Sequence, residues 1–233
     1  MKQKIANQII TNTATAYDHI SSHFSATRQY NWTEIKKITD KYVKPNSSIL
    51  DLGCGNGRLL SILPDHINYH GLDISASLIK QAKKYSENHR KTNQKISFQE
   101  SSLLDLKKIN HKYDYIFAIA SLHHIPSDKY RNQVVQEIYR LLKPAGIFVM
   151  TNWDLFQPKY QKYINKNFSL DPNLDENDSL IPWHNPDKQI IAQRYYHTFN
   201  QEEIKQLLLS NNFTVIKNYV NNHNIISISR KEV

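Results

Sequence analysis

The segment that most constrains the fold is Ser48-Ile-Leu-Asp-Leu-Gly-Cys-Gly-Asn-Gly57. It begins as an apolar run of strand length and then turns to glycine, which predicts a buried strand ending in a tight turn that opens a helix. Glycines at 53, 55 and 57 let the backbone approach a ligand closely, because a Cβ would fill the space that the ligand needs. Asp51 adds a carboxylate just before the turn. The combination is typical of a site for a nucleoside cofactor.

The spacing of the glycines indicates which cofactor. The dinucleotide fingerprint is G-x-G-x-x-G, and its third glycine allows close helix-to-strand packing. Here that position is Arg58. The observed D-x-G-x-G-x-G pattern instead resembles the S-adenosylmethionine loop of class I methyltransferases. The next predicted strand, 68–73, ends in Asp73, an acid suited to hold two ribose hydroxyls. We therefore favour S-adenosylmethionine, with a nicotinamide dinucleotide and a plain structural turn as the alternatives.

Length and charge set the broad class of protein. At 233 residues the chain can bury a substantial core, and its net charge of +9 favours an anionic partner such as nucleic acid. Fourteen tyrosines are scattered among the lysines and could stack on unpaired bases. Compositional drift toward Lys, Asn, Ile and Tyr would produce the same charge, so the charge alone does not decide between the two interpretations.

The compartment is predicted from what the sequence lacks. No stretch approaches the roughly 18 consecutive apolar residues that a membrane span needs. The first residues, Met1-Lys-Gln-Lys-Ile-Ala-Asn-Gln, lack the apolar core of a secretion signal. The single cysteine, Cys54, can form no internal disulfide. These features predict a cytoplasmic protein without a membrane segment.

Strands and helices alternate along most of the chain, which is the signature of a parallel, doubly wound sheet. The fold class expected is α/β: a Rossmann-like, mostly parallel seven-stranded sheet with helices on both faces and an antiparallel C-terminal hairpin. Strands are predicted at 48–52, 68–73, 96–98, 113–120, 147–153, 213–219 and 224–229, and helices at 5–24, 31–42, 57–63, 76–89, 128–142 and from Asn200 to about 210.

The domain organisation expected is one domain spanning 1–233. Its first 45 residues form helices that cap the sheet. Residues 154–193 show no clear period and contain four prolines, so they are interpreted as an insertion on the substrate side.

A pair of histidines, His123 and His124, follows the fourth strand. In open α/β sheets the ligand crevice lies at the carboxyl ends of the strands. The pair is therefore expected at the site, next to the glycine turn, where at least one ring touches substrate or cofactor.

Six short motifs, spread over nearly the whole chain, give a more specific resemblance. They are Tyr17-Asp-x-Ile-x-x-His-Phe-Ser-x-Thr-Arg28, Asp51-Leu-Gly-Cys-Gly-Asn-Gly57, Gly71-Leu-Asp73, Ser121-Leu-His-His124, Ile181-Pro-Trp-His184 and Arg194-Tyr-Tyr-His-x-Phe199. With them the chain resembles the class I methyltransferases that act on the tRNA wobble base, specifically the family that esterifies 5-carboxymethyluridine. The resemblance implies methyl transfer from S-adenosylmethionine to a carboxylate in the tRNA anticodon loop. Eukaryotic members work with a small zinc-binding activator subunit, which is therefore a candidate partner.

The resemblance also implies which residues form the site, and none of them is a metal ligand. The expected catalytic residues are Arg28 with His123 or His124. The expected cofactor-binding residues are Asp51, Gly53, Cys54, Gly55, Asn56, Gly57, Asp73, Ile74, Ser102, Leu103 and Ala120. The expected substrate-binding residues are Tyr17, Trp183, His184, Arg194, Tyr195, Tyr196 and His197.

The chain departs from the family's pattern at two positions. Ser102 stands where many methyltransferases carry an acid for the adenine amino group, with Glu100 and Asp105 as the fallback candidates. Ala145 replaces a glycine that is usual in the Lys-Pro-Gly-Gly turn.

The chemistry suits these residue types. Methyl transfer is an in-line displacement, so the enzyme must mainly align nucleophile and methyl about 3 to 3.5 Å apart. A carboxylate is already ionised at neutral pH and needs no strong general base. Arg28 either orients the substrate carboxylate or holds the carboxylate of the cofactor. Trp183, Tyr195 and Tyr196 could stack on an extruded base, with an ordinary core position as the alternative for Trp183.

Two rival functions remain at this point. One is a small-molecule carboxylate methyltransferase, and the other is a non-catalytic RNA-binding protein with a methyltransferase fold. The second would be expected to have a damaged glycine loop, whereas the loop here is intact.

Overall fold

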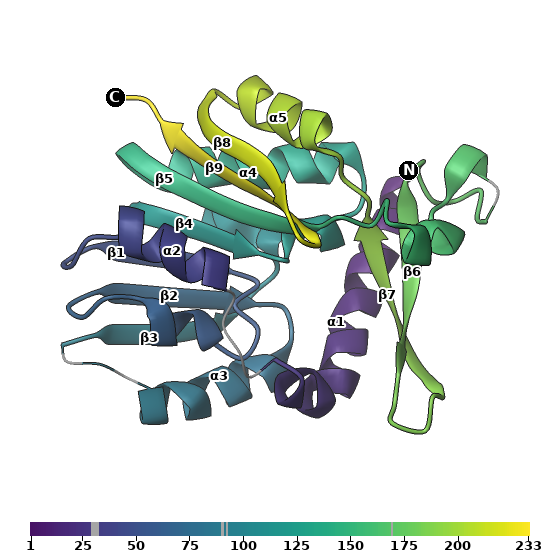
Figure 1. Cartoon of the computed structure of the whole chain (residues 1–233), viewed down its shortest axis with the longest axis horizontal. Helices are drawn as coiled ribbons and strands as arrows, with labels where there is room; N and C mark the ends of the chain where they lie inside the picture. Colours follow the sequence, from purple (N-terminus) through teal and green to yellow (C-terminus); the bar gives the residue numbers. More distant parts are fainter. Residues whose placement is uncertain (29–32, 90, 92, 169) are drawn as a thin grey trace.

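The computed structural model describes residues 1–28, 33–89, 91, 93–168 and 170–233. The described residues form a seven-stranded sheet of order β3-β2-β1-β4-β5-β9-β8 (Figure 1). Strands β1 to β5 run parallel, whereas β9 is antiparallel to both β5 and β8. The expected Rossmann-like sheet with a C-terminal hairpin is thereby confirmed. The strands are β1 (Ser48–Leu52), β2 (Asn68–Asp73), β3 (Lys95–Glu100), β4 (Tyr113–Ile119), β5 (Leu142–Trp153), β8 (Phe213–Asn221) and β9 (Asn224–Lys231).

Helices cover both faces of this sheet (Figure 1). Neighbouring residues on a strand point to opposite faces. Accordingly Leu50 belongs to a core cluster with α4 and α5, whereas Ile49 belongs to a second cluster with α2 and η1. The α-helices are α1 (Gln3–Ala26), α2 (Thr33–Tyr42), α3 (Ala76–His89), α4 (Asp128–Leu141) and α5 (Gln201–Ser210). The 3-10 helices are η1 (Arg58–Ile62), η2 (Leu103–Lys108), η3 (Leu122–His124), η4 (Pro158–Tyr163) and η5 (Lys166–Phe168).

A second, two-stranded sheet stands beside the first, with α1 between them (Figure 1). It consists of β6 (Asp178–His184) and β7 (Ile190–His197), which pair antiparallel. Helix α1 contacts β7 on one side and α3 on the other. Asp18 in α1 accepts hydrogen bonds from Ser75 Oγ at 2.6 Å and from the Ser77 backbone N–H at 3.0 Å, at the N-terminus of α3. This contact ties the first helix to the parallel sheet.

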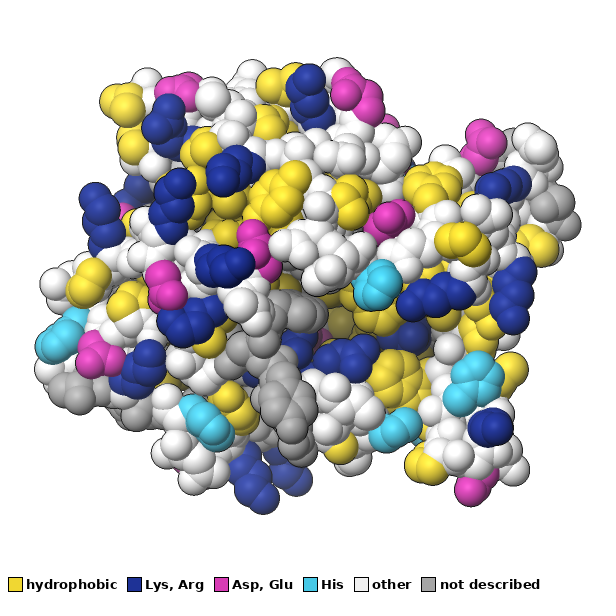
Figure 2. Space-filling view, viewed as in Figure 1, with side chains coloured by type: hydrophobic (Ala, Val, Ile, Leu, Met, Phe, Trp, Pro, Cys, Tyr) yellow, Lys and Arg dark blue, Asp and Glu magenta, His cyan; other side chains and the backbone are white. Residues whose placement is uncertain are grey.

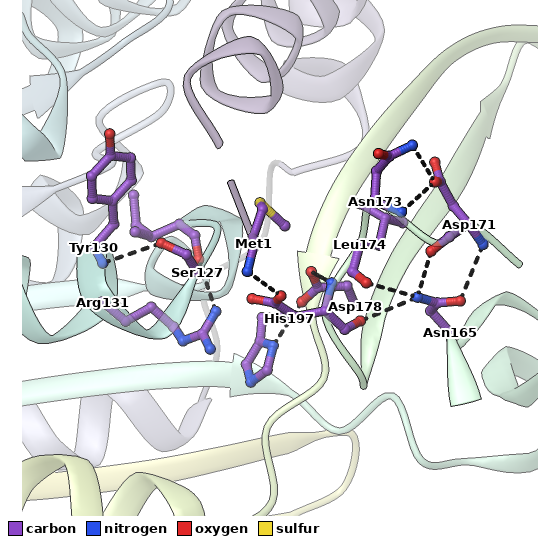
Figure 3. Close-up of polar contacts among 12 residues, drawn as sticks. Met1, Ser127, Tyr130, Arg131, Asn165, Asp171, Asn173, Leu174, Asp178 and His197 are labelled. Atoms are coloured by element: carbon purple, nitrogen blue, oxygen red, sulfur yellow. Dashed lines mark hydrogen bonds and ion pairs between the residues drawn. The ribbon is translucent and has the colours of Figure 1, made fainter. Parts of the chain in front are cut away.

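The base of the two-stranded sheet is fixed by a buried polar network (Figure 3). Asp178 is fully buried and accepts from Tyr195 Oη at 2.7 Å and from His197 Nδ1 at 2.9 Å. His197 Nε2 donates to Glu203 at 2.6 Å. Burial alone would lower the pKa of His197, but its bonds to both carboxylates raise it above the usual value. The amide of Asn165 bridges the loop before β6 through the carbonyls of Asp171, Leu174 and Asp175.

Two predictions about local structure were wrong. The helix expected at 57–63 is the short 3-10 helix η1, because Pro64 holds Leu63 in an extended conformation and leaves only five helical residues. The irregular segment expected at 154–193 contains β6 and the first part of β7. Pro182 obscured β6, although a two-stranded sheet has only edge strands, where proline is tolerated.

Candidate active site

A cavity opens at the carboxyl ends of β1, β2 and β4, where α/β sheets place their ligands. Its wall comes from the loops after these strands, from α1, and from β7 of the second sheet. Figure 2 shows a hollow between the seven-stranded sheet and the two-stranded sheet, with basic and apolar side chains at its rim. The cavity is thus shared between the two parts of the fold.

The three glycines of the loop differ in what a side chain at each position would contact. A Cβ at Gly53 would lie 2.4 Å from Ser121 Cβ, and a Cβ at Gly57 would lie 3.2 Å from Ala82 Cβ in α3. A Cβ at Gly55 would meet only Phe24 Cε1, at 3.6 Å, so the space beside Gly55 is open to a ligand. All three residues have positive φ, which disfavours any other residue. Gly53 and Gly55 line the cavity, whereas Gly57 lies behind it against α3.

Two buried acids form one end of the cavity. Asp73 accepts from the backbone N–H groups of Gly55 at 2.8 Å and Ser75 at 2.9 Å, and Asp51 accepts from Tyr69 Oη at 2.6 Å. Burial raises the pKa of Asp51 to about 7 and that of Asp73 to about 6. A cationic ligand would stabilise both carboxylates in their charged form. This end therefore favours a positively charged group.

The acids and the open glycine turn fit S-adenosylmethionine. Asp73 ends β2 within the cavity wall, as a partner for ribose hydroxyls requires. Of the expected cofactor-binding residues, all except Gly57 lie in that wall: Asp51, Gly53, Cys54, Gly55, Asn56, Asp73, Ile74, Ser102, Leu103 and Ala120.

The position expected to face the adenine is Ser102, which lines the cavity. Its Oγ accepts from the Leu104 backbone N–H at 3.2 Å, as the cap of η2. Glu100 is exposed at the end of β3, and Asp105 pairs with Lys108 at 2.7 Å. Neither fallback residue is in the cavity wall.

The two histidines are neutral and held in opposite tautomers. His124 Nδ1 donates to the Tyr195 carbonyl at 2.7 Å, so its Nε2 accepts from Tyr17 Oη at 2.8 Å. His123 Nδ1 accepts from the Trp153 backbone N–H at 3.3 Å, so its proton is on Nε2. Burial lowers the pKa of His124 to about 3 and that of His123 well below its usual value. No described residue accepts from His123 Nε2–H, which leaves it as the donor for a ligand.

Arg194, on β7, belongs to a second, basic end of the cavity. Its side chain is 3% exposed, and its Cζ lies 4.5 Å from the ring centre of Trp183 and 5.2 Å from that of Tyr196. Among the described residues, Nε and Nη1 have no hydrogen-bond partner and no carboxylate forms an ion pair with the guanidinium. The buried Tyr196 hydroxyl likewise has no partner there. Burial lowers the pKa of Arg194, but the hydroxyls of Tyr196 and Tyr17 outweigh it, and the pKa is raised.

A second arginine faces the same end. Arg28 is half-buried after α1, with its Cζ 5.4 Å from the ring centre of Phe24 and 5.9 Å from that of Trp183. Burial lowers the pKa of Arg28, and the charge of Arg194 lowers it further. A buried cation is costly unless it is paired, so two arginines at one end favour an anionic ligand.

Four of the expected substrate-binding residues lie outside the cavity wall. His184 is exposed at the end of β6. Trp183 is 9% exposed and donates from Nε1 to His23 Nδ1 at 3.0 Å. Its ring packs against the guanidinium groups of Arg28 and Arg194. The rings of Tyr195 and His197 belong to the buried Asp178 network, and the stacking expected of Tyr195 does not fit that position.

The cavity wall contains residues that the prediction did not include, among them Arg58 and Trp153. Arg58 follows the glycine loop, where burial, followed by the charge of Arg28, lowers its pKa to about 10. Trp153 ends β5, and its ring stacks on Tyr196 with centroids 5.3 Å apart. The carboxyl-end rule that located the histidines would have located Trp153 as well.

Comparison with known proteins agrees with the fold and with the expected cofactor. Residues 50–148 match the methyltransferase domain family. A solved S-adenosylmethionine-dependent methyltransferase from Methanosarcina mazei has the same fold, with a TM-score of 0.70 and 21% identity, over 87% of this chain and 99% of that one. The chain is an S-adenosylmethionine-dependent methyltransferase of the Rossmann-like class.

Its relatives include proteins with an assigned substrate. The tRNA (carboxymethyluridine(34)-5-O)-methyltransferase of Schizosaccharomyces pombe is 29% identical over 210 residues, which are 82% of this chain and 84% of that protein. The Arabidopsis thaliana protein of the same name is 31% identical over 140 residues, 59% of this chain and 31% of that protein. The expected resemblance to this family is confirmed. None of the helices in the described part of the chain combines the length and apolar character that a membrane span requires.

Proposed function

We propose that the chain methyl-esterifies the carboxylate of a 5-carboxymethyl-type uridine at the wobble position of tRNA. The observation that carries the proposal is the buried guanidinium of Arg194, which has N–H groups without partners among the described residues and lines the same cavity as Asp51 and Asp73. A methyltransferase cavity that has both buried acids and a buried arginine suits a cationic methyl donor and an anionic nucleophile. The names of the related tRNA methyltransferases supply the substrate class.

The residues divide the work as follows. Asp73 and the open turn at Gly55 hold the cofactor, which supplies an electrophilic methyl on a sulfonium sulfur. Arg194 binds the substrate carboxylate through its free N–H groups, and Arg28 orients it from the other side. His123 donates from Nε2 to an oxygen of the substrate. Tyr17 and His124 form a rigid wall through their mutual hydrogen bond.

The charge balance favours turnover. The carboxylate oxygen forms a bond to the methyl carbon while the carbon–sulfur bond breaks, and the two opposite charges cancel. The ester product is neutral, so Arg194 loses its anionic partner when the reaction is complete. Alignment in a site that excludes water supplies most of the acceleration, and no general base is needed.

The remaining expectations belong to this proposal. We propose one domain in which residues 1–45 cap the sheet and residues 154–193 contribute the substrate side. Cytoplasmic tRNA is the expected substrate, and a small zinc-binding activator subunit, implied by the family resemblance, is the candidate partner.

The test is incubation of the purified chain, S-adenosylmethionine labelled in its methyl group, and tRNA carrying 5-carboxymethyluridine, followed by nucleoside mass spectrometry. The expected product is the methyl ester at the wobble position, absent when the RNA carries plain uridine. Labelling of small carboxylic acids but not RNA would favour a small-molecule enzyme. Cofactor binding without transfer to any RNA, also in the presence of an activator subunit, would favour a non-catalytic RNA-binding protein.

A further inference from the structure

A run of basic and aromatic residues follows β5, outside the cavity wall and shortly after Trp153, which lines the cavity. Residues 155–170 contain three lysines and no acidic residue. Two of the lysines, Lys159 and Lys162, lie on η4 and are exposed. Among the described residues no carboxylate forms an ion pair with them.

The geometry of η4 sorts its side chains onto two faces. In a 3-10 helix residues three apart are eclipsed, and each residue rises about 2 Å, so Lys159 and Lys162 project from one face with Cα atoms about 6 Å apart. Tyr160 and Tyr163 project from another face and pack against the buried cluster of Leu155, Ile181 and Tyr196. The tyrosines anchor η4. The two exposed ammonium groups lie 4.6 and 5.0 Å from the ring centres of Tyr160 and Tyr163, and among the described residues no carboxylate pairs with either.

The anchoring face leads directly to the cavity. Tyr160 stacks on Trp153 at 6.4 Å with an interplanar angle of 26°, and Trp153 stacks on Tyr196, which lines the cavity. Burial is the main influence on the pKa of both Arg28 and Arg194, and Tyr160 is among the side chains that raise both. Helix η4 is therefore next to the basic end of the site.

We infer that η4 binds the RNA strand that flanks the target nucleoside, with Lys159 and Lys162 on its phosphates. This inference rests on the proposed function, because it assumes an RNA substrate. Adjacent lysines without counter-ions suit the regularly spaced charges of a nucleic-acid backbone, and contacts of this kind supply sequence-independent affinity. An acidic protein partner would also contact such a face, but the short path from η4 to the cavity favours the strand that carries the substrate.

The test measures binding of a fluorescent anticodon stem-loop RNA to the full chain over a range of salt concentrations. In the double variant K159Q/K162Q we expect affinity at low salt to fall about tenfold. The slope of log K against log salt should decrease by about 1.4, because each single-strand phosphate contact contributes about 0.7. The matched control is K80Q/K83Q on the exposed side of α3, which has the same spacing and charge change. It should lose much less affinity.

Two further readouts separate the possible outcomes. Thermal melting and S-adenosylmethionine affinity of K159Q/K162Q should match those of the wild type, which excludes a folding defect. If the wild type methylates the RNA and K159Q/K162Q binds RNA with unchanged affinity and salt slope, this inference is overturned and the proposed function stands. If the wild type methylates no RNA and an acidic protein alone is bound through these lysines, both fail.

Discussion

The two ends of the cavity differ in charge and in how completely their polar groups are paired. The acidic end lies at the carboxyl ends of β1 and β2, where Asp51 and Asp73 accept hydrogen bonds from Tyr69 and from backbone N–H groups. The basic end comes from α1 and β7, where Arg194 has two nitrogens without partners among the described residues. Under the proposed function, the fold therefore preorganises the cofactor end, whereas the bound carboxylate of the substrate would complete the basic end.

The largest expected effect comes from Arg194→Met at the basic end. Methyl transfer to RNA should fall about 100- to 1000-fold, because truncating one partner of a buried charge pair costs about 2 to 5 kcal/mol. Cofactor affinity, measured by calorimetry, should change little. The free protein should melt no lower than the wild type, because the variant removes an unpaired buried charge. Arg194→Lys is the control, because it keeps the positive charge but lacks the planar guanidinium that binds a carboxylate through two N–H groups. Near wild-type transfer by Arg194→Met would remove the role assigned to the basic end.

A smaller effect is expected from Gly55→Ala at the acidic end. The left-handed backbone costs a residue with a Cβ about 1 to 2 kcal/mol, and the methyl would occupy ligand space, so S-adenosylmethionine affinity should fall about tenfold. Gly57→Ala carries similar strain, but its methyl would press on α3 and Phe98. It should lower the free energy of unfolding and affect cofactor affinity less. Equal effects of the two variants on affinity would contradict the assignment of Gly55 to the cavity.

The acids predict a pH dependence of cofactor binding. With a pKa of about 7 for Asp51 and about 6 for Asp73, both are protonated as the pH falls through this range. Affinity for the cationic cofactor should therefore fall, by up to about tenfold per pH unit for each group that must ionise. Both pKa values are raised above that of an unfolded chain, so the contribution of these groups to stability grows as the pH falls from 7 to 4. Calorimetry and melting at pH 8, 7, 6 and 5.5 should show these opposite trends, and Asp51→Asn should weaken both.

The smallest effect concerns a position away from both ends. Ala145 has φ of 62° in the turn within β5, where the related family usually has glycine. Ala145→Gly should raise the free energy of unfolding by about 0.5 to 1 kcal/mol, because relief of left-handed strain exceeds the added entropy of the unfolded chain. Chemical denaturation measures this change. A lower free energy of unfolding would contradict the strain assigned to Ala145, and a changed rate of methyl transfer would show that the turn is coupled to the site.

The sequence predicted the parallel sheet well and the second sheet poorly. Strands such as Ser48–Leu52 are continuous apolar runs because both faces are buried, so local pattern and final environment agree. Residues 178–197 form a hairpin held by Asp178, His197 and Asn165, polar side chains whose burial and pairing leave no apolar pattern in the sequence. Only the assembled structure shows those contacts.

The same difference applies to the site. The acidic end follows from strand ends and glycine spacing, both of which are local in sequence. The unpaired state of Arg194 and the opposite tautomers of His123 and His124 depend on the side chains that the fold brings around them. Among these are Trp183 on the paired strand β6 and Trp153 at the end of β5. The placement of Tyr195 and His197 in a structural network also depends on Asp178. Motif resemblance located this region of the chain but could not assign these individual roles.

The central claim is that Arg194 recognises the carboxylate of the substrate base. The most direct measurement compares binding of two anticodon stem-loop RNAs, one with 5-carboxymethyluridine and one with its neutral amide, 5-carbamoylmethyluridine, to wild type and to Arg194→Met. The wild type should bind the acid about 10- to 100-fold more tightly than the amide, and Arg194→Met should bind the two RNAs equally. Equal binding by the wild type, or a preference for the acid that survives in Arg194→Met, would contradict the claim.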